Sequence, residues 1–227
     1  KGKVKEPLLV CGKDKALKCG EEFKVFNYGF YRKTEKEIKI GYLYPRNSYD
    51  LMKAVVNGIY TFAKLGKYHG EKDLYTMAGL LDLDVKAMVR EEYELGDIAD
   101  YKRAANKLQK IEGIDLVIAL VPDGMEEDGP YNPFKTIWAK ANIPSQMISM
   151  KTAKLFAEEA KEGNKAKNNS RYYLHNIILG ILGKTGGIPW VVKDMPGNVD
   201  CFVGLDVATI AKGIHYPACS VVFDKYG

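Results

Sequence analysis

The chain has 227 residues, 46% of them apolar, so it is long and apolar enough to bury a core. No apolar run approaches the ~20 residues that span a bilayer, and no secretory signal opens the chain, which favours a cytoplasmic location and no membrane partner. The net charge of +5 lies entirely in residues 1–41, with 11 Lys/Arg and 6 Asp/Glu, because the rest holds 23 of each. A broad basic field is thereby excluded, and any nucleic-acid binding needs a local site.

The four cysteines (Cys11, Cys19, Cys201 and Cys219) form no CxxC or Cys/His zinc pattern. Their spacing predicts reduced intracellular thiols. From its first and last residues, we expect the chain to be a piece of a longer protein.

Residues 1–37 contain two short β-like runs, 8–11 and 23–32, with little apolar surface, so we predict a linker or the edge of a preceding domain. Residues 38–44 are the first clear strand, which Pro45 halts. Asn47 or Ser48 then caps a helix that runs to about Gly66.

A strand is predicted at 87–95, and a helix follows that Asp97 caps and Gly113 closes. Residues 114–121 form an aliphatic run typical of a strand buried on both faces of a parallel sheet. A helix (133–141), a strand (146–150), a Lys/Glu/Asn-rich insertion (154–169) and a last helix (171–184) complete the series. This alternation predicts an α/β fold, with a Rossmann-like, open, mainly parallel sheet flanked by helices.

After Gly186-Gly187 the pattern changes to short strands. Residues 188–193 form a connecting strand, and 201–207 with 215–223 form a β-hairpin that begins a different sheet. We therefore predict a boundary near residue 195, with one domain at 38–195 and the start of a second at 196–227.

Loop 122–132 follows the aliphatic strand, and ligands of open α/β sheets lie beyond the carboxyl ends of strands. Asn132-Pro133 fits a helix N-cap and first turn, whose free N–H groups attract anions. Lys135 in that first turn opposes the helix dipole unless an anion is bound, and Tyr131 could stack on what the anion carries. Taken alone, these two residues are better explained as a solvated lysine and an ordinary loop tyrosine, and the acidic run 126–128 counts against an anion.

Asn176, Gly180 and Lys184 are four residues apart and so share one helix face, which suits a phosphate lying along it. The alternative is that Lys184 caps the helix C-terminus, where the dipole favours a cation. Gly183-Lys184-Thr185 is not a P-loop, because Ile178 stands where that motif needs glycine.

Asp206 lies inside an apolar strand, where a carboxylate is costly without a partner or a metal. RNase H-like nucleases place a metal-binding Asp on their first strand, and the predicted hairpin fits such a domain. Two-metal hydrolysis needs several carboxylates together, and the residues after Asp206 do not supply them. We therefore expect no enzyme activity from this chain by itself.

The segments Tyr131-Asn-Pro-Phe-Lys135, Ile143-Pro-Ser-Gln146 and Asn176 through Lys184-Thr-Gly-Gly-Ile-Pro-Trp190 together resemble the MID domain of Argonaute proteins. The tail Val203-Gly-Leu-Asp-Val207 resembles the opening of their PIWI domain. The resemblance covers residues 38–227 and is strongest to an archaeal Argonaute of the Methanocaldococcus type. It implies that 38–195 is a MID domain and 196–227 the start of an RNase H-like PIWI domain.

The resemblance also implies roles for six residues. Tyr131 would stack on the first base of a guide strand. The guide 5′-phosphate would be bound by Lys135, Gln146 and Lys184, with Asn176 near the first or second phosphate. Asp206 would be the first catalytic, metal-binding carboxylate of the longer protein.

Gly180 stands where eukaryotic relatives have a second lysine, so a divalent cation (Mg or Mn) is expected to help in the pocket. We therefore predict a module that anchors the 5′-phosphorylated end of a single-stranded guide DNA or RNA, completed by the rest of the PIWI domain in cis. The longer protein would be a guide-directed endonuclease. The alternative is a Rossmann-like enzyme that acts on a small phosphorylated metabolite.

Overall fold

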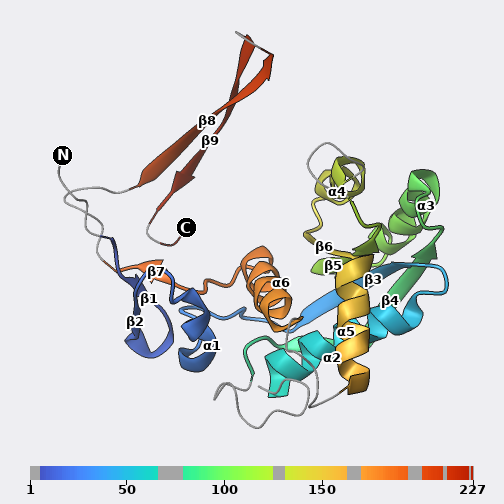
Figure 1. Ribbon diagram of the computed structural model, residues 1–227, viewed down its shortest axis with the longest axis horizontal. Coiled ribbons are helices and arrows are strands. Elements are labelled where there is room, and N and C mark those ends of the chain that lie inside the picture. Colours follow the sequence, from blue (N-terminus) through green and yellow to red (C-terminus); the bar gives the residue numbers. More distant parts are fainter. Residues whose placement is uncertain are drawn as a thin grey trace. The chain divides into compact units, whose positions relative to one another are not determined.

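The computed structural model describes residues 6–65, 79–124, 131–162, 170–193, 201–211, 214–224 and 226. The chain divides into two compact units, and each is described by itself. The larger unit is Lys33–Gly187, and the smaller one combines Lys1–Arg32 with Ile188–Gly227. Figure 1 shows that the larger unit carries the alternating strands and helices.

The larger unit is built on a four-stranded sheet with the order β4-β3-β5-β6. The strands are β3 (Ile38–Pro45), β4 (Leu83–Tyr93), β5 (Leu116–Val121) and β6 (Ser145–Ser149). Every neighbouring pair is parallel, and all six residues of β5 are buried. The predicted α/β class with an open parallel sheet is therefore confirmed, and β6 is an edge strand of this sheet.

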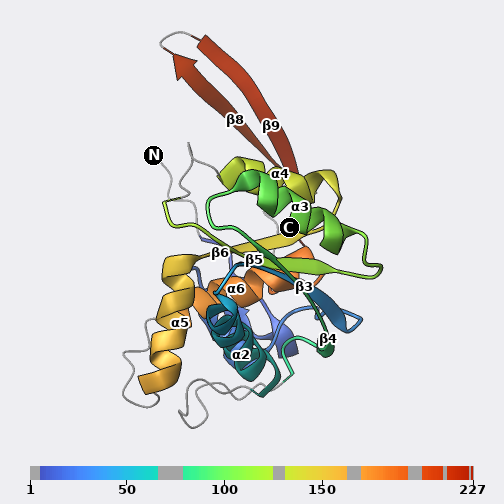
Figure 2. The ribbon, with the colours of Figure 1, turned by 90° about the vertical axis from the view of Figure 1, so that its right-hand side faces the viewer.

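Five helices cover the two faces of the sheet (Figure 2). On one face lie α2 (Tyr49–Leu65), α5 (Met150–Glu162) and α6 (Ser170–Lys184), which contact one another. On the other face α3 (Ile98–Gln109) contacts α4 (Tyr131–Lys140).

The core beneath α3 and α4 is rich in aromatic side chains. Tyr101, Phe134 and Trp138 are almost fully buried, and the ring centroids of Tyr101 and Phe134 are 4.2 Å apart. Trp138 Nε1 donates to the Tyr101 hydroxyl at 2.6 Å, so both buried polar groups are satisfied. This packing fixes α4 firmly against the sheet.

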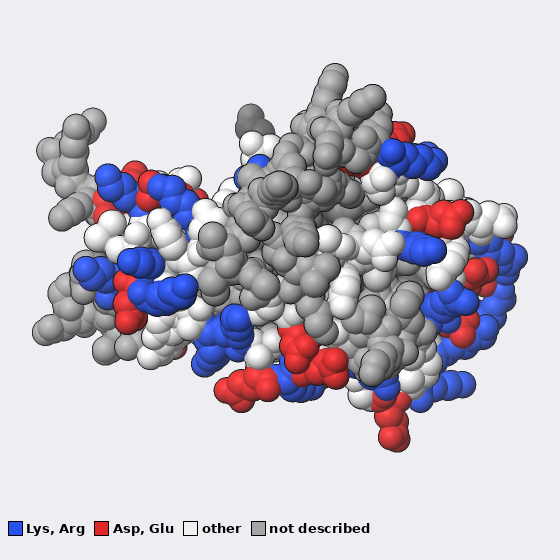
Figure 3. Space-filling view, turned by 90° about the horizontal axis from the view of Figure 1, so that it is seen from below, with Lys and Arg blue, Asp and Glu red and all other residues white. Residues whose placement is uncertain are grey.

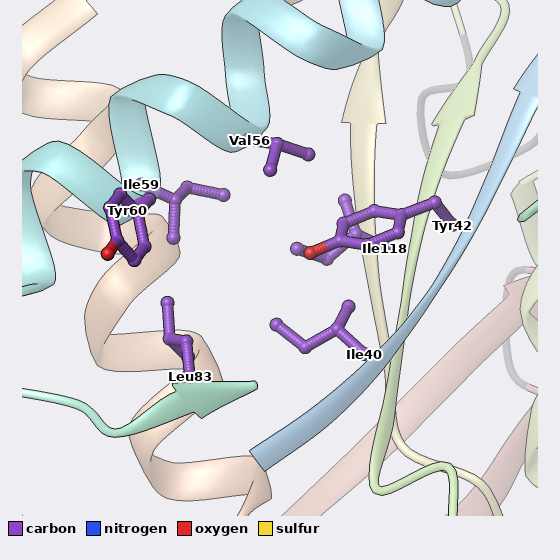
Figure 4. Close-up of a pocket in the computed structure, with 7 residues that line it drawn as sticks. All are labelled: Ile40, Tyr42, Val56, Ile59, Tyr60, Leu83 and Ile118. Atoms are coloured by element: carbon purple, nitrogen blue, oxygen red, sulfur yellow. The ribbon is translucent and has the colours of Figure 1, made fainter. Parts of the chain in front are cut away.

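The core beneath α2 is aliphatic, and Figure 4 shows the two walls of a small apolar pocket within it. From α2 come Val56, Ile59 and Tyr60, and from the strands Ile40, Tyr42, Leu83 and Ile118. With no charged group in its lining, this pocket is a packing feature and not a candidate site.

Some predicted boundaries need correction. The insertion predicted at 154–169 is helical up to Glu162, because Ala153 and Phe156 bury one face of α5 while its charged residues cover the other. Residues 163–169 lie outside the described residues. The strand predicted at 87–95 begins at Leu83, and α3 ends at Gln109 rather than at Gly113.

The smaller unit contains an antiparallel sheet with the order β2-β1-β7 and three other short elements. Its elements are β1 (Leu9–Val10), the 3-10 turn Gly12–Asp14, β2 (Ala16–Leu17), the 3-10 turn Glu22–Lys24, α1 (Val25–Tyr28) and β7 (Val191–Val192). The predicted strand at 23–32 is wrong. Phe23, Phe26 and Phe30 follow helical spacing, and Phe26 and Phe30 are buried.

The smaller unit also contains the predicted hairpin, with β8 (Phe202–Ala211) antiparallel to β9 (Ile214–Phe223). On the face drawn in Figure 3, the coloured acidic and basic side chains are interspersed, so no broad basic surface stands out there. No helix in the described ranges is long and apolar enough to cross a membrane.

Candidate functional site

Lys135 is positioned by α4, whose neighbouring residues Phe134 and Trp138 anchor the helix in the core. Its ammonium donates to the backbone oxygen of Ser145 at 2.5 Å and to the Ser145 hydroxyl at 2.9 Å. Ser145 itself is buried, so the lysine is tied to the first residue of β6. We had not predicted this partner, although a polar residue that opens a buried strand is a usable signal.

The predicted cap of α4 is not confirmed, because the helix begins at Tyr131 and places Asn132 and Pro133 inside its first turn. Proline is still tolerated there, since the first four N–H groups of a helix have no intrahelical partner. Lys135 is consequently the fifth helical residue, and it reaches β6 rather than the open end of α4. The preceding segment, 125–130, which holds the acidic run, lies outside the described residues.

Gln146, the second residue of β6, meets α6 across the edge of the sheet. Its Oε1 accepts a hydrogen bond from Lys184 Nζ at 2.5 Å. A Cβ atom added to Gly180 would lie 2.8 Å from Gln146 Oε1 and 3.6 Å from Lys184 Nζ. Gly180, Gln146 and Lys184 therefore meet at one point.

The end of α6 decides between the two interpretations of Lys184. The Thr185 hydroxyl donates to the carbonyls of Ile181 and Leu182, and the Gly187 N–H also donates to Leu182. These contacts satisfy carbonyls of the last turn without the lysine, whose ammonium bonds Gln146 instead. The structure thus favours a site role for Lys184 over C-terminal capping.

The two lysines approach the start of β6 from opposite faces of the sheet. Lys135 belongs to α4 on one face, and Lys184 to α6 on the other. They can meet because β6 is an edge strand, beyond which no further strand of this sheet intervenes in the described part of the chain. We call the group Lys135, Ser145, Gln146, Gly180 and Lys184 the cup.

The position of the cup corrects one expectation. The loop after β5 was predicted to hold the ligand, because ligands usually lie at the carboxyl ends of parallel strands. The cup instead lies at the amino end of β6, where Ser145 pairs with Val117 near the start of β5. Side chains of α4 and α6 reach the cup because β6 is at the edge of the sheet. The carboxyl ends of the strands play no part in it.

The cup holds two neighbouring cations, Lys135 and Lys184, whose ammonium groups are partly buried. Burial lowers the pKa of Lys135. Burial and the nearby charge of Lys135 lower the pKa of Lys184 to about 8. Lys184 is exposed as a residue, but its ammonium is turned toward the protein to reach Gln146. Both shifts mean that the surroundings disfavour the charged forms of the two lysines, and an anion beside the ammonium groups would relieve this cost.

The cup also has hydrogen-bond donors to spare. An ammonium has three N–H donors; among the described residues, Lys135 uses two and Lys184 uses one. Gln146 Nε2 makes a long bond of 3.3 Å to the Met147 carbonyl. Such a surplus of donors with positive charge fits a phosphate, which offers several acceptor oxygens.

The other predicted site residues lie outside the cup or have side chains that are not described. Asn176 is an exposed residue of α6, two turns from Lys184 on the same face. Tyr131 is the first residue of α4 and Asp206 lies in β8, where the pairing with β9 shifts register between Leu205 and Val207. The side chains of Tyr131 and Asp206 lie outside the described residues.

The described donor set does not fit a divalent cation by itself. Around the cup it provides two ammonium groups, an amide and a serine hydroxyl, and no described residue there contributes a carboxylate. Across the described ranges, no group of three or more His, Cys, Asp or Glu could hold a metal. The divalent cation therefore stays a prediction, and no step is assigned to it.

The chain is similar to several known proteins. Residues 116–226 match the family model of the Piwi domain. A curated relative, "Protein argonaute" of Aquifex aeolicus, is 32% identical over 129 residues, which cover 53% of this chain and 16% of that protein. A solved structure of Clostridium butyricum Argonaute, bound to a guide DNA with a 5′ deoxycytidine and a 19-mer target DNA, is 46% identical. Its TM-score is 0.82, and the match covers 100% of this chain and 29% of that chain.

Residues 116–226 of this chain are therefore similar to a Piwi domain, and the chain as a whole is similar to a segment of Argonaute proteins. It spans less than a third of the Clostridium butyricum chain and about a sixth of the Aquifex aeolicus protein.

The expected kinship with an archaeal Argonaute is not supported. The Argonaute structure from Methanocaldcoccus janaschii is 16% identical with a TM-score of 0.60, over 98% of this chain and 31% of that one, so it shows the shared fold alone. The bacterial Clostridium butyricum protein is nearly three times as similar in sequence.

Proposed function

We propose that the cup binds the 5′-phosphate of a single-stranded guide DNA or RNA. The observation that carries this proposal is the meeting of Lys135, Gln146 and Lys184, from three elements, at one edge strand. The Clostridium butyricum relative, which is 46% identical, was solved with a guide DNA. The surplus donors and the lowered lysine pKa values support an anionic ligand.

In this proposal the residues divide into those that bind phosphate, those that position a lysine and one that stacks on a base. Lys135 and Lys184 each donate to phosphate oxygens, while Ser145 holds Lys135 in place. Gln146 orients Lys184 and offers its Nε2 donor. Tyr131 stacks on the first base, and Asn176, further along α6, contacts the first or second phosphate.

The domain assignment belongs to the same proposal. Residues 38–195 are a MID domain, and 196–227 begin a PIWI domain that the rest of the longer protein completes. Residues 1–37 are a linker or the edge of a preceding domain. Asp206 is the first catalytic carboxylate of a guide-directed endonuclease. In this proposal the chain alone anchors a guide, and cutting needs further carboxylates from the longer protein.

A titration tests the proposal. A 5′-phosphorylated oligonucleotide, its 5′-hydroxyl twin and free nucleoside monophosphates are compared by fluorescence anisotropy or competition. We expect the phosphorylated strand to bind best, and Lys135→Ala or Lys184→Ala to weaken it by ~1.5–3 kcal/mol, the range for hydrogen bonds to charged groups. The exposed Lys53 of α2 gives a control, because Lys53→Ala removes the same charge on a different helix.

The competing function, an enzyme acting on a small phosphorylated metabolite, makes the opposite prediction. It requires tight binding of monophosphates and indifference of the oligonucleotides to their 5′ group. Unchanged affinity in both lysine variants would contradict the cup itself.

A further inference from the structure

A second concave surface lies in the larger unit, between α3 and α4. It is a groove of about 610 Å³. In Figure 2, α3 and α4 lie on the face of the sheet opposite α2, α5 and α6. Its lining comprises Ile98, Lys102, Asn106, Gln109, Pro133, Thr136, Ile137, Lys140 and Ala141. None of these residues belongs to the cup, so the proposed function leaves the groove unexplained.

The groove is made by two parallel stripes of side chains. Along α3 the lining residues follow one another at intervals of four, four and three. On α4 and just after its end they fall at 133, at 136 and 137, and at 140 and 141, about one turn apart, so each set shares a helix face. The core uses different residues of the same helices, among them Tyr101, Leu108, Phe134 and Trp138. The stripes are therefore not needed to hold the fold together.

Part of the groove is apolar and open to solvent. Ile98 is 40% exposed, and Leu95, in the turn that precedes α3, is 49% exposed. Pro133, Ile137 and Ala141 continue the apolar surface on α4. Contiguous exposed apolar side chains with polar neighbours are typical of a surface that another protein covers.

The charges of the groove have one sign. Lys102 and Lys140 line it, and no acidic residue does so within the described part of the chain. Other cations of α3 are compensated: Arg103 pairs with Asp100, and Lys107 with Glu91. No ion pair among the described residues includes Lys102 or Lys140. The groove therefore offers two uncompensated positive charges beside an apolar floor.

We propose that this groove docks an amphipathic helix of an acidic protein partner. Apolar residues of that helix would lie on Ile98 and Ile137, and carboxylates on its flanks would meet Lys102 and Lys140. The 12 residues of α3 give a length of about 18 Å, which matches roughly three turns of a docked helix. A nucleic-acid strand fits less well, since two cations and no aromatic ring line the groove.

The test uses a fluorescent helical peptide of about 14 residues, with leucines along one face and glutamates on both flanks. A second peptide carries lysine in place of every glutamate. We expect the acidic peptide to bind the chain, and Lys102→Glu/Lys140→Glu to weaken it at least about fivefold while strengthening the basic peptide. The matched control is Lys53→Glu/Lys161→Glu, the same charge change on α2 and α5, which should change neither affinity.

The result that overturns the proposal is equal binding of the acidic and the basic peptide, or no effect of the double reversal at 102 and 140. Competition by a 5′-hydroxyl oligonucleotide that depends on Lys102 and Lys140 would assign the groove to nucleic acid instead. Amide chemical shifts locate the peptide: perturbation confined to 98–109 and 133–141 supports the groove, and perturbation elsewhere contradicts it. Thermal unfolding of each variant verifies that the fold is intact.

Discussion

Gly180 packs directly against the Gln146 side chain of the cup. Any side chain there begins with a Cβ atom 2.8 Å from Gln146 Oε1, closer than real Cβ contacts come. The neighbouring glycine of the same helix, Gly183, faces open space, and no atom lies within 4 Å of an added Cβ. The two positions therefore separate an effect on the cup from a general effect on the helix.

We predict that Gly180→Ala weakens binding of a 5′-phosphorylated strand by about tenfold, the loss of roughly one hydrogen bond to a charged group. The methyl group displaces the Gln146 amide, which in turn releases Lys184. Gly183→Ala should keep the affinity, and alanine should favour the helix slightly at both positions. Equal affinities of the two variants would show that the close contact at Gly180 does not matter for binding.

Lys184 predicts a dependence of binding on pH. A phosphate binds the ammonium form, and the pKa of Lys184 is lowered to about 8, so affinity should fall as the pH rises above about 8. Below about pH 6 the phosphate gains a proton, which places the best binding between about 6 and 8. We expect a loss of up to about tenfold between pH 8 and pH 9 when one proton is linked to binding.

Lys184→Arg is the control for this pH dependence, because a guanidinium stays charged at pH 9. If its affinity fell as steeply as that of the unaltered chain, Lys184 would not be the titrating group. For the unliganded protein the sign is reversed. Below pH 8 the folded protein must keep Lys184 charged in surroundings that disfavour the charge, which lowers the free energy of unfolding. That free energy should therefore rise as the pH increases through 8, where Lys184 loses its proton in the folded state.

At the scale of single residues, the sequence supplied candidates but not their contacts. Lys135, Gln146 and Lys184 were assigned to a phosphate from a family resemblance, and that role stays a prediction. The structure shows Lys135 bonded to Ser145, and Lys184 bonded to Gln146, at the start of β6. The Ser145 contact was missed, because an interaction between a helix and the following strand leaves no periodic signal. The side-chain role of Tyr131 stays a prediction.

At the scale of elements, the site depends on the order of the strands. Alternating strands and helices in the sequence predict a parallel sheet but not which strand lies at its edge. If another strand were paired with β6, its backbone would lie between Lys135 and Lys184. The sequence pointed to loop 122–132 because that loop follows the end of β5. The cup lies at the start of β6 because β6 is an edge strand, which the sequence does not reveal.

The periodicity of apolar residues predicted long helices well and short ones poorly. α2, α3 and α6 were expected within a few residues, because each combines an apolar stripe with a start or stop signal. α5 was hidden by its many Lys and Glu residues, and α1 has only four residues, too few to show a period. A helix that buries only a narrow face can therefore have the composition of a loop, as α5 does.

The start of α3 gives a prediction at this scale. Asp97 Oδ1 accepts hydrogen bonds from the N–H groups of Ala99 at 2.8 Å and Asp100 at 3.1 Å, as an N-cap does. Asp97→Ala should lower the free energy of unfolding by about 1 kcal/mol, measured by urea denaturation, and Asp97→Asn should keep most of it. A larger loss in the Asn variant than in the Ala variant would show that capping is not the cause.

At the scale of the whole molecule, the charge distribution limits how the chain can bind nucleic acid. Residues 42–227 carry no net charge, and the coloured surface in Figure 3 mixes both signs. Affinity for a guide must then come from the cup and a few neighbouring contacts, rather than from a general attraction to the backbone.

This distribution predicts a weak dependence of binding on salt. With about two phosphates contacted, the slope of log K against log salt concentration should lie near −1.4, from roughly −0.7 per phosphate of a single strand. Binding of a phosphorylated oligonucleotide at several salt concentrations measures this slope. A value several times steeper would mean that the strand follows a long basic path outside the cup.

The most direct test of the central claim is a structure of the chain with a 5′-phosphorylated oligonucleotide. The 5′-phosphate should lie among Lys135, Gln146 and Lys184, with both ammonium nitrogens about 2.7–2.9 Å from its oxygens, the range for charge-assisted hydrogen bonds. A phosphate bound elsewhere, with Lys184 still on Gln146 and nothing but solvent in the cup, would contradict the account.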